Sequence, residues 1–196
     1  MISETSVRFD ELVRAVGDAP ERALPPIERW NPPDCGEIDM RIDRDGVWFH
    51  EGRPIRRPAL VKLFASVLTR EQERYVLVTP AEKVGIRVED APFLAVDMAV
   101  EPTAGGETLV FRTNLDDLVR CDADHPLRFD PQPGSDELRP YIYVRRGLWA
   151  RLTRAVFLDL AERVEEREIE GRAIFGAASA GAFFPLATAE TVKASL

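Results

Sequence analysis

The chain has 196 residues, 45% of them hydrophobic, so it can bury a core and is not a wholly disordered protein. Its formal net charge of −8 argues against general binding to DNA, RNA or an anionic membrane, because a phosphate-rich surface would repel it. A chain of this length suits one large domain or two small ones.

The basic residues are almost all arginine, with 23 Arg and three Lys. A GC-rich genome accounts for this bias, and so does recognition of anions by guanidinium groups, so both interpretations stay open. The two cysteines, Cys35 and Cys121, have no partners at metal-ligand spacing, and no apolar signal segment is visible. We therefore expect reduced thiols in the cytoplasm, no metal, no bound cofactor and no membrane span.

The first half of the chain predicts a short helix followed by an α+β domain. Residues 1–20 contain an amphipathic pattern that favours a helix, and a proline-rich extended segment with Trp30 follows. Strands are expected at 39–43 and 47–50, joined by a hairpin turn at Asp45-Gly46. A helix should begin near Pro58, and further strands at 75–78, 84–88 and 93–96.

A linker is expected at Glu101–Glu107, which is rich in turn-forming residues. It would separate a first α+β domain at 21–102 from a second, β-rich domain at 107–196. In the second domain, strands are expected at 108–113, 118–121 and 127–129, and a long helix at about 149–168. The tail at 171–196 fits a helix and a strand equally well.

A local pattern occurs twice, at an offset of 95 residues. An aromatic strand, a glycine turn and an amphipathic helix follow one another around Gly52 and again around Gly147. When the two glycines are aligned, Tyr143 corresponds to Trp48. We infer a duplicated strand–turn–helix core with a mostly antiparallel sheet. A seam between two such halves is where a ligand would bind.

No motif in the sequence identifies a reaction. There is no nucleotide-binding glycine loop, no nucleophile elbow and no zinc-ligand spacing. The remaining candidates are polar or aromatic residues near strand ends and turns, and each also has a purely structural interpretation, such as a capped turn or an edge charge pair. The candidate ligand-binding residues are Trp48, His50, Arg57, Lys83, Asp90, Arg112, Asn114, His125 and Arg128.

A series of motifs covers about residues 25–170. They are Pro25-Pro26 with Trp30, Gly36-x-Ile38-Asp39-Met40-Arg41-Ile42, Asp45-Gly46-x-Trp48-x-His50-x-Gly52-x-Pro54-Ile55-x-Arg57, Leu60-Val61-x-Leu63-Phe64, Val78-Thr79-Pro80-x-Glu82-Lys83, Val88-x-Asp90-Ala91-Pro92-Phe93, Phe111-Arg112-Thr113-Asn114 and His125-Pro126-Leu127-Arg128. In this combination they resemble a bacterial family of unknown function, DUF1285.

The resemblance implies an α+β protein with a duplicated core and a strand-rich second half similar to a pleckstrin-homology-like barrel. It also implies a polar site between the halves for a nucleotide-like ligand in a signalling role, and it brings no catalytic activity.

We therefore expect a cytoplasmic protein that binds an anionic or nucleotide-like small molecule between residues 25–100 and 107–170. Arg57, Lys83, Arg112 and Arg128 would supply positive charge, Trp48 would stack on a base, and Asn114 and Asp90 would contact its polar edges. Two alternatives stay open. One is a small hydrolase that uses His50 or His125 as a base, with Asp90 orienting it, and the other is a protein-interaction scaffold that docks through the Trp30 segment.

Overall fold

The computed structural model describes residues 24–103, 106–132 and 137–188. The chain divides between Ala91 and Pro92 into two compact units, here called unit 1 (residues 1–91) and unit 2 (residues 92–196). The helix expected at 1–20 lies outside the described residues. The linker expected at 101–107 instead falls at the tip of a hairpin, where Thr103 pairs with Gly106. Among the described residues, no helix has the length and apolar character that a membrane crossing requires.

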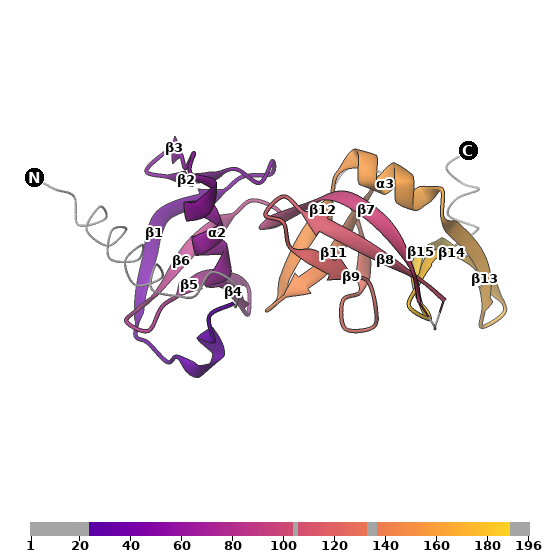
Figure 1. Cartoon of the computed structure of the whole chain (residues 1–196), viewed down its shortest axis with the longest axis horizontal. Helices are drawn as coiled ribbons and strands as arrows, with labels where there is room; N and C mark the ends of the chain where they lie inside the picture. Colours follow the sequence, from indigo (N-terminus) through magenta and orange to yellow (C-terminus); the bar gives the residue numbers. More distant parts are fainter. Residues whose placement is uncertain (1–23, 104–105, 133–136, 189–196) are drawn as a thin grey trace, which may run out of the picture. The chain divides into compact units, whose positions relative to one another are not determined.

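From residue 24 onward, unit 1 is a six-stranded sheet with one α-helix, α2, over it (Figure 1). The strands lie in the order β3-β2-β1-β6-β5-β4, and β1 and β6 are parallel while the other neighbours are antiparallel. A 3-10 turn, η1, at Ile27–Arg29 precedes the sheet. The elements are β1 (Asp34–Ile42), β2 (Trp48–His50), β3 (Arg53–Pro54), α2 (Pro58–Ser66), β4 (Leu68–Glu71), β5 (Arg74–Val78) and β6 (Lys83–Val88).

Unit 2 contains a second six-stranded sheet, ordered β10-β11-β12-β7-β8-β9, in which β7 and β12 are parallel. A three-stranded antiparallel sheet, β13-β14-β15, follows it. The elements are β7 (Phe93–Thr103), β8 (Gly106–Thr113), β9 (Leu118–Arg120), β10 (Leu127–Pro131), β11 (Leu138–Arg145), β12 (Leu148–Leu152), α3 (Arg154–Ala161), β13 (Val164–Ile169), β14 (Arg172–Ser179) and β15 (Ala182–Thr188).

The two six-stranded sheets share one topology. In each, two three-stranded meanders lie side by side. The strands that come first and last along the chain are therefore neighbours in the middle of the sheet and run parallel, β1 with β6 and β7 with β12. The duplicated, mostly antiparallel core is therefore confirmed. The equivalence is different from the one that the sequence suggested, because the pattern around Gly52 lies on the second and third strands of its sheet and the pattern around Gly147 on the fifth and sixth.

The hairpin turns explain why short polar pairs interrupt the strands. Four hairpins have two-residue turns in which both residues have positive φ, the geometry of the type I′ turn that matches strand twist. Glycine occupies the second position each time because it adopts positive φ without strain. The four turns are Glu51-Gly52, Arg146-Gly147, Glu170-Gly171 and Ala180-Gly181.

Helix α2 begins where the sequence predicts and packs on the sheet of unit 1. Pro58 takes the first helical position, where its missing N–H has no intrahelical partner to lose. The helix buries Val61, Phe64 and Ala65, and the Phe64 ring stacks on Trp48 of β2 with 6.2 Å between ring centroids. This aromatic pair is at the centre of the unit 1 core.

The prediction of a long helix at 149–168 is wrong, because only Arg154–Ala161 are helical. The apolar steps of four residues extend across β12, α3 and β13, and only Val156 and Leu160 of that series form the buried stripe of the helix. The described residues contain two α-helices and are mostly β, so the α+β class is too loose for this fold.

The three-stranded sheet is attached to the larger sheet of unit 2 through Ser179, which is 1% exposed. Its hydroxyl accepts the backbone N–H of Leu109 at 2.9 Å and donates to the carbonyl of Cys121 at 2.6 Å. The next residue, Ala180, donates its N–H to the carbonyl of Glu107. A buried backbone donor and acceptor of the larger sheet therefore depend on one side chain of β14.

We expect Ser179→Ala to destabilise the protein by about 1–3 kcal/mol, because it leaves the Leu109 N–H and the Cys121 carbonyl buried without a partner. The melting temperature should fall by roughly 2–12 °C for a chain of this size. Ser66→Ala, which removes a half-buried hydroxyl donating to Leu63 at the end of α2, is the matched control and should cost less. Equal melting temperatures for the two variants would contradict this role of Ser179.

Candidate functional site

The nine residues expected to bind a ligand fall in both units. Unit 1 holds Trp48, His50, Arg57, Lys83 and Asp90, and unit 2 holds Arg112, Asn114, His125 and Arg128. The contacts of each residue within its own unit show which of them are structural and which are available for a ligand.

Trp48 is a core residue. It is 1% exposed and stacked on Phe64, so its ring offers no face on which a base could stack. His50 is half-buried on the same strand, where it lies opposite Met40 of β1. Arg57 is exposed at the start of α2, and Asp90 is half-buried just after β6.

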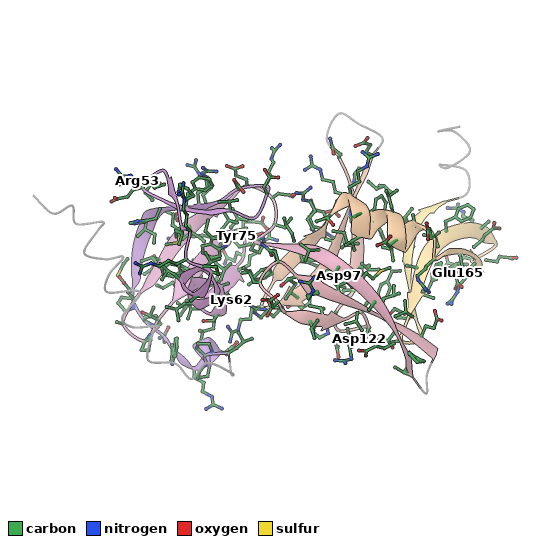
Figure 2. All side chains as sticks on the ribbon, turned by 45° about the horizontal axis from the view of Figure 1, so that its top comes forward. Arg53, Lys62, Tyr75, Asp97, Asp122 and Glu165 are labelled. Atoms are coloured by element: carbon green, nitrogen blue, oxygen red, sulfur yellow. The ribbon has the colours of Figure 1, made fainter. Side chains whose placement is uncertain are left out.

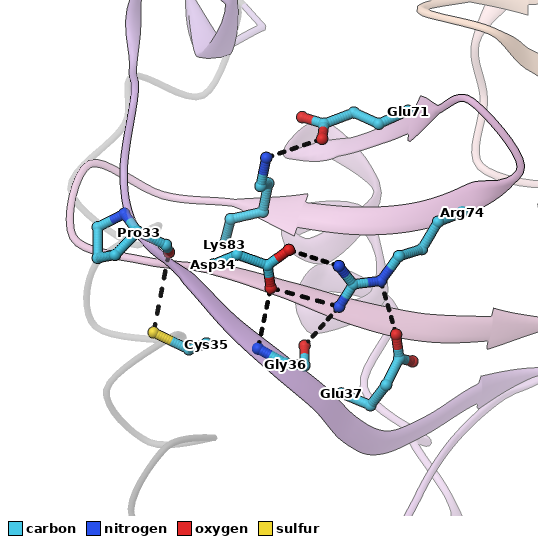
Figure 3. A network of polar contacts seen from close by, with 8 residues as sticks. All are labelled: Pro33, Asp34, Cys35, Gly36, Glu37, Glu71, Arg74 and Lys83. Atoms are coloured by element: carbon cyan, nitrogen blue, oxygen red, sulfur yellow. Dashed lines mark hydrogen bonds and ion pairs between the residues drawn. The ribbon is translucent and has the colours of Figure 1, made fainter.

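Lys83 belongs to a polar network around Arg74 (Figure 3). The Lys83 ammonium pairs with Glu71 at 2.8 Å, so its partner is on β4 rather than the neighbouring Glu82. The Arg74 guanidinium donates through Nε to Glu37 at 2.6 Å, through Nη1 to Asp34 at 2.5 Å and through Nη2 to the Gly36 carbonyl at 2.8 Å.

This network joins the irregular start of β1 to β5 and β6. β1 has register shifts between Asp34 and Arg41, and Gly36 has a φ of 85°. A Cβ on Gly85 would collide with the ends of Arg74 and Glu37, so glycine at 85 leaves room for this ion pair on the sheet surface. All three guanidinium nitrogens of Arg74 already have partners, which favours a structural role over ligand binding.

Arg112 and Asn114 also have protein partners. Arg112 lies between Asp97, at 3.2 Å, and Asp116, at 3.7 Å. The Asn114 carboxamide oxygen accepts a hydrogen bond from the backbone N–H of Leu94. The backbone N–H of Asn114 donates to the Leu94 carbonyl. Asn114 therefore fixes the turn after β8 to the start of β7, which is a structural role.

The remaining two predicted residues, His125 and Arg128, form part of one aromatic cluster in unit 2. The His125 ring lies 6.1 Å from Tyr143, and Tyr143 meets Trp149 edge-to-face at 5.2 Å. The Arg128 guanidinium lies 4.3 Å from the Trp149 ring centre and 5.0 Å from that of Tyr141. We call His125, Tyr143, Trp149 and Arg128 the aromatic row.

Strand pairing explains why these side chains meet. Arg128 of β10 lies opposite Tyr141 of β11, and Tyr143 of β11 lies opposite Trp149 of β12. Directly opposite residues of antiparallel strands share a face of the sheet, so alternate positions of β10, β11 and β12 place the cation and the rings on one face. His125 reaches this face from the turn before β10, where the Tyr143 N–H donates to the Pro126 carbonyl.

Asp122, which is labelled in Figure 2, accepts the hydrogen bonds that hold this turn together. Its Oδ1 accepts the N–H groups of Asp124 and His125 at 2.9 and 2.8 Å and lies 3.1 Å from His125 Nδ1. Partial burial acts to raise the pKa of the Asp122 carboxyl, but these donors outweigh it and hold the pKa below its usual range. Asp122 is therefore an ionised acceptor at neutral pH.

The residues near His125 do not supply a nucleophile. Cys121 is fully buried, and burial raises the pKa of its thiol to about 12, so it stays protonated at neutral pH. The carboxylate beside His125 is Asp122 rather than the expected Asp90. Within the described part of the chain, no group of three or more His, Cys, Asp or Glu is placed to hold a metal ion.

The sequence interpretation missed Tyr143, Trp149 and Asp122 as site residues. The first two flank the Arg146-Gly147 turn, but a regular two-residue hairpin there would pair Tyr143 with Ala150. A register shift between Tyr143 and Arg145 places Trp149 opposite Tyr143 instead, and the sequence carries no signal for that shift. Asp122 was visible only as a turn residue, because its position beside His125 depends on how the turn folds.

A groove of about 610 Å³ lies beside the three-stranded sheet, and its lining includes Ser179. Its charged side chains are largely paired with one another, Arg163 with Glu107 at 3.1 Å and Arg167 with Glu165 at 2.6 Å. The aromatic row, in contrast, contains a cation with unused donors.

Comparison with protein families identifies the whole described core. Residues 25–91 match the model "Domain of unknown function (DUF1285), N-terminal domain", and residues 92–186 match "Protein of unknown function (DUF1285), C-terminal domain". The chain belongs to the DUF1285 family. The resemblance inferred from the sequence motifs is thereby confirmed, and the family boundary coincides with the division between Ala91 and Pro92.

Two solved structures of DUF1285 proteins are similar to the chain. One, from Silicibacter pomeroyi DSS-3, is 44% identical, has a TM-score of 0.82, and the match covers 93% of this chain and 97% of that one. Another, from Shewanella baltica OS155, is 29% identical with a TM-score of 0.52 over 64% of this chain and 91% of that one. No curated protein matches the sequence.

The Arg74 network predicts how the stability of this DUF1285 protein depends on acid pH. Hydrogen bonds from Arg74, then from the Gly36 N–H, hold the pKa of Asp34 below its ordinary value of 3.8. The unfolded state therefore binds the proton more readily, so the stabilisation is present above about pH 5 and is lost as pH falls through the folded pKa. We expect Asp34→Asn to lower the melting temperature at pH 7, and the difference from the wild type to shrink as the pH falls through the folded pKa of Asp34.

Thermal melts monitored by circular dichroism from pH 2 to 7 would measure both curves. Parallel curves for wild type and Asp34→Asn over that range would contradict a role for the ionised Asp34.

Proposed function

We propose that this DUF1285 protein binds a small anionic molecule with a planar, nucleotide-like ring at the aromatic row of unit 2. The observation that supports this most directly is the state of Arg128. Its side chain is 41% exposed, its guanidinium lies against Trp149 and Tyr141, and its Nε is 2.9 Å from Asp130. Among the described residues, none hydrogen-bonds to its two terminal amino groups.

An arginine held in this way is suited to an anion. Stacking on aromatic rings reduces the freedom of the guanidinium, so less entropy is lost when it binds. The two terminal amino groups then provide parallel donors, which match the paired oxygens of a phosphate or carboxylate. The neighbouring Tyr143 and His125 rings supply surface on which a planar group can stack.

The charge of the chain limits the size of the ligand. With a net charge of −8 and with Asp122 and Asp130 beside the row, a long polyanion would meet repulsion beyond the first phosphate. A small molecule with one anionic group avoids this cost. Binding without a nucleophile suits a regulatory protein, and we place this protein in the reducing cytoplasm, where the thiols of Cys35 and Cys121 stay reduced.

The test is binding of nucleoside phosphates, dinucleotides and aromatic carboxylates to the full chain, followed by thermal shift and calorimetry. A ligand at 100 times its dissociation constant stabilises by about 2.7 kcal/mol. That corresponds to a shift of roughly 5–10 °C for a chain of this size. Arg128→Lys keeps the charge but loses the planar fork, so we expect it to weaken binding about tenfold or more.

Arg120→Lys is the matched control, because Arg120 is an exposed arginine of β9 paired with Glu101. It should bind the ligand as the wild type does. A panel without any shift, or a shift that Arg128→Lys leaves unchanged, would overturn the proposal.

A further inference from the structure

The aromatic row has chemically different ends. At one end Arg128 offers two donors, and at the other Asp122 offers an acceptor beside His125, with the rings of Tyr143 and Trp149 between them. The successive spacings along the row are 4.3, 5.2 and 6.1 Å. A nucleotide has the same order of groups, with an anionic phosphate at one end and the polar edge of a planar base at the other.

The two carboxylate oxygens of Asp122 are not equivalent. Oδ1 is occupied by the N–H groups of Asp124 and His125 and by its contact with His125 Nδ1. Oδ2 has no hydrogen-bond donor among the described residues, and the side chain is 40% exposed. The same donors that fix the turn keep the carboxyl ionised, so Oδ2 can only accept a hydrogen bond.

We propose, resting on the function proposed above, that Asp122 Oδ2 accepts the exocyclic amino group of the bound base and that, among purine nucleotides, the site selects the adenine nucleotide. One free oxygen suits one amino group. Guanine presents two adjacent donors, N1–H and the 2-amino group, and a carboxylate needs both of its oxygens to accept them. Asp122 cannot do so, because its Oδ1 is already occupied. A base with a carbonyl at the same place, such as hypoxanthine, would direct an oxygen at the carboxylate and be rejected.

The experiment compares AMP with purine riboside 5′-monophosphate, which lacks only the amino group, by calorimetry on the full wild-type chain. One hydrogen bond to a charged group predicts that AMP binds about tenfold or more tightly. IMP, with a carbonyl in place of the amino group, should bind more weakly than AMP as well.

Asp122→Asn tests the residue directly. The asparagine oxygen can still accept the N–H groups of Asp124 and His125, so the turn is retained, while an amino group replaces Oδ2. We expect the preference for AMP over IMP to be lost or reversed in this variant. Asp97→Asn, an exposed aspartate of β7 paired with Arg112 outside the row, should leave the preference unchanged.

The outcomes separate this inference from the proposed function. If AMP and purine riboside 5′-monophosphate bind equally well and Arg128→Lys weakens both, the anion site stands and the role of Asp122 is overturned. If neither nucleotide binds, the adenine inference is overturned, whereas the proposed function is overturned only if the whole ligand panel gives no shift. The wild-type comparison decides between these outcomes even if Asp122→Asn does not fold.

Discussion

The structure depends on one pairing in each unit, the parallel contact between the first and last strands of a six-stranded sheet. Because β1 lies beside β6, and β7 beside β12, the third and fourth strands end at opposite edges. The chain must therefore travel from one edge to the other between its two meanders. Unit 1 does so with the segment that contains α2, which covers the face it crosses and buries Phe64 against Trp48.

Unit 2 makes the same crossing with a much shorter connection. From Arg120 to Leu127 the chain has seven residue steps, at most about 25 Å when fully extended. Five interstrand spacings of a flat sheet amount to about 24 Å. Since Asp122 and His125 are folded into a turn, the segment is far from extended, so the sheet must curl until β9 and β10 approach each other. The turn that presents Asp122 and His125 is thus a consequence of topology, and its tightness fixes both side chains.

The sequence was informative where structure is decided locally. The Asp45-Gly46 hairpin, the start of α2 at Pro58 and most strands follow from turn residues and periodicity. The helix expected at 149–168 failed because a four-residue apolar spacing continued by coincidence across a strand, a helix and another strand. The repeat at Gly52 and Gly147 was a repeat of local structure, while the duplicated topology links β1 with β7, and only strand pairing shows that. His125 and Arg128 were found as polar residues near a turn, but their neighbours Tyr143 and Trp149 needed the register of β11 and β12.

The outer strand of the small sheet has a consequence for how copies of the protein behave when crowded. β13 pairs with β14 on one side only within the described residues, and Glu165, Glu166 and Glu168 are exposed along it. An open strand edge is a template for growth of intermolecular sheets, and like charges placed along it oppose such growth. Growth of an intermolecular sheet from this strand would therefore bring the glutamates of two copies close together.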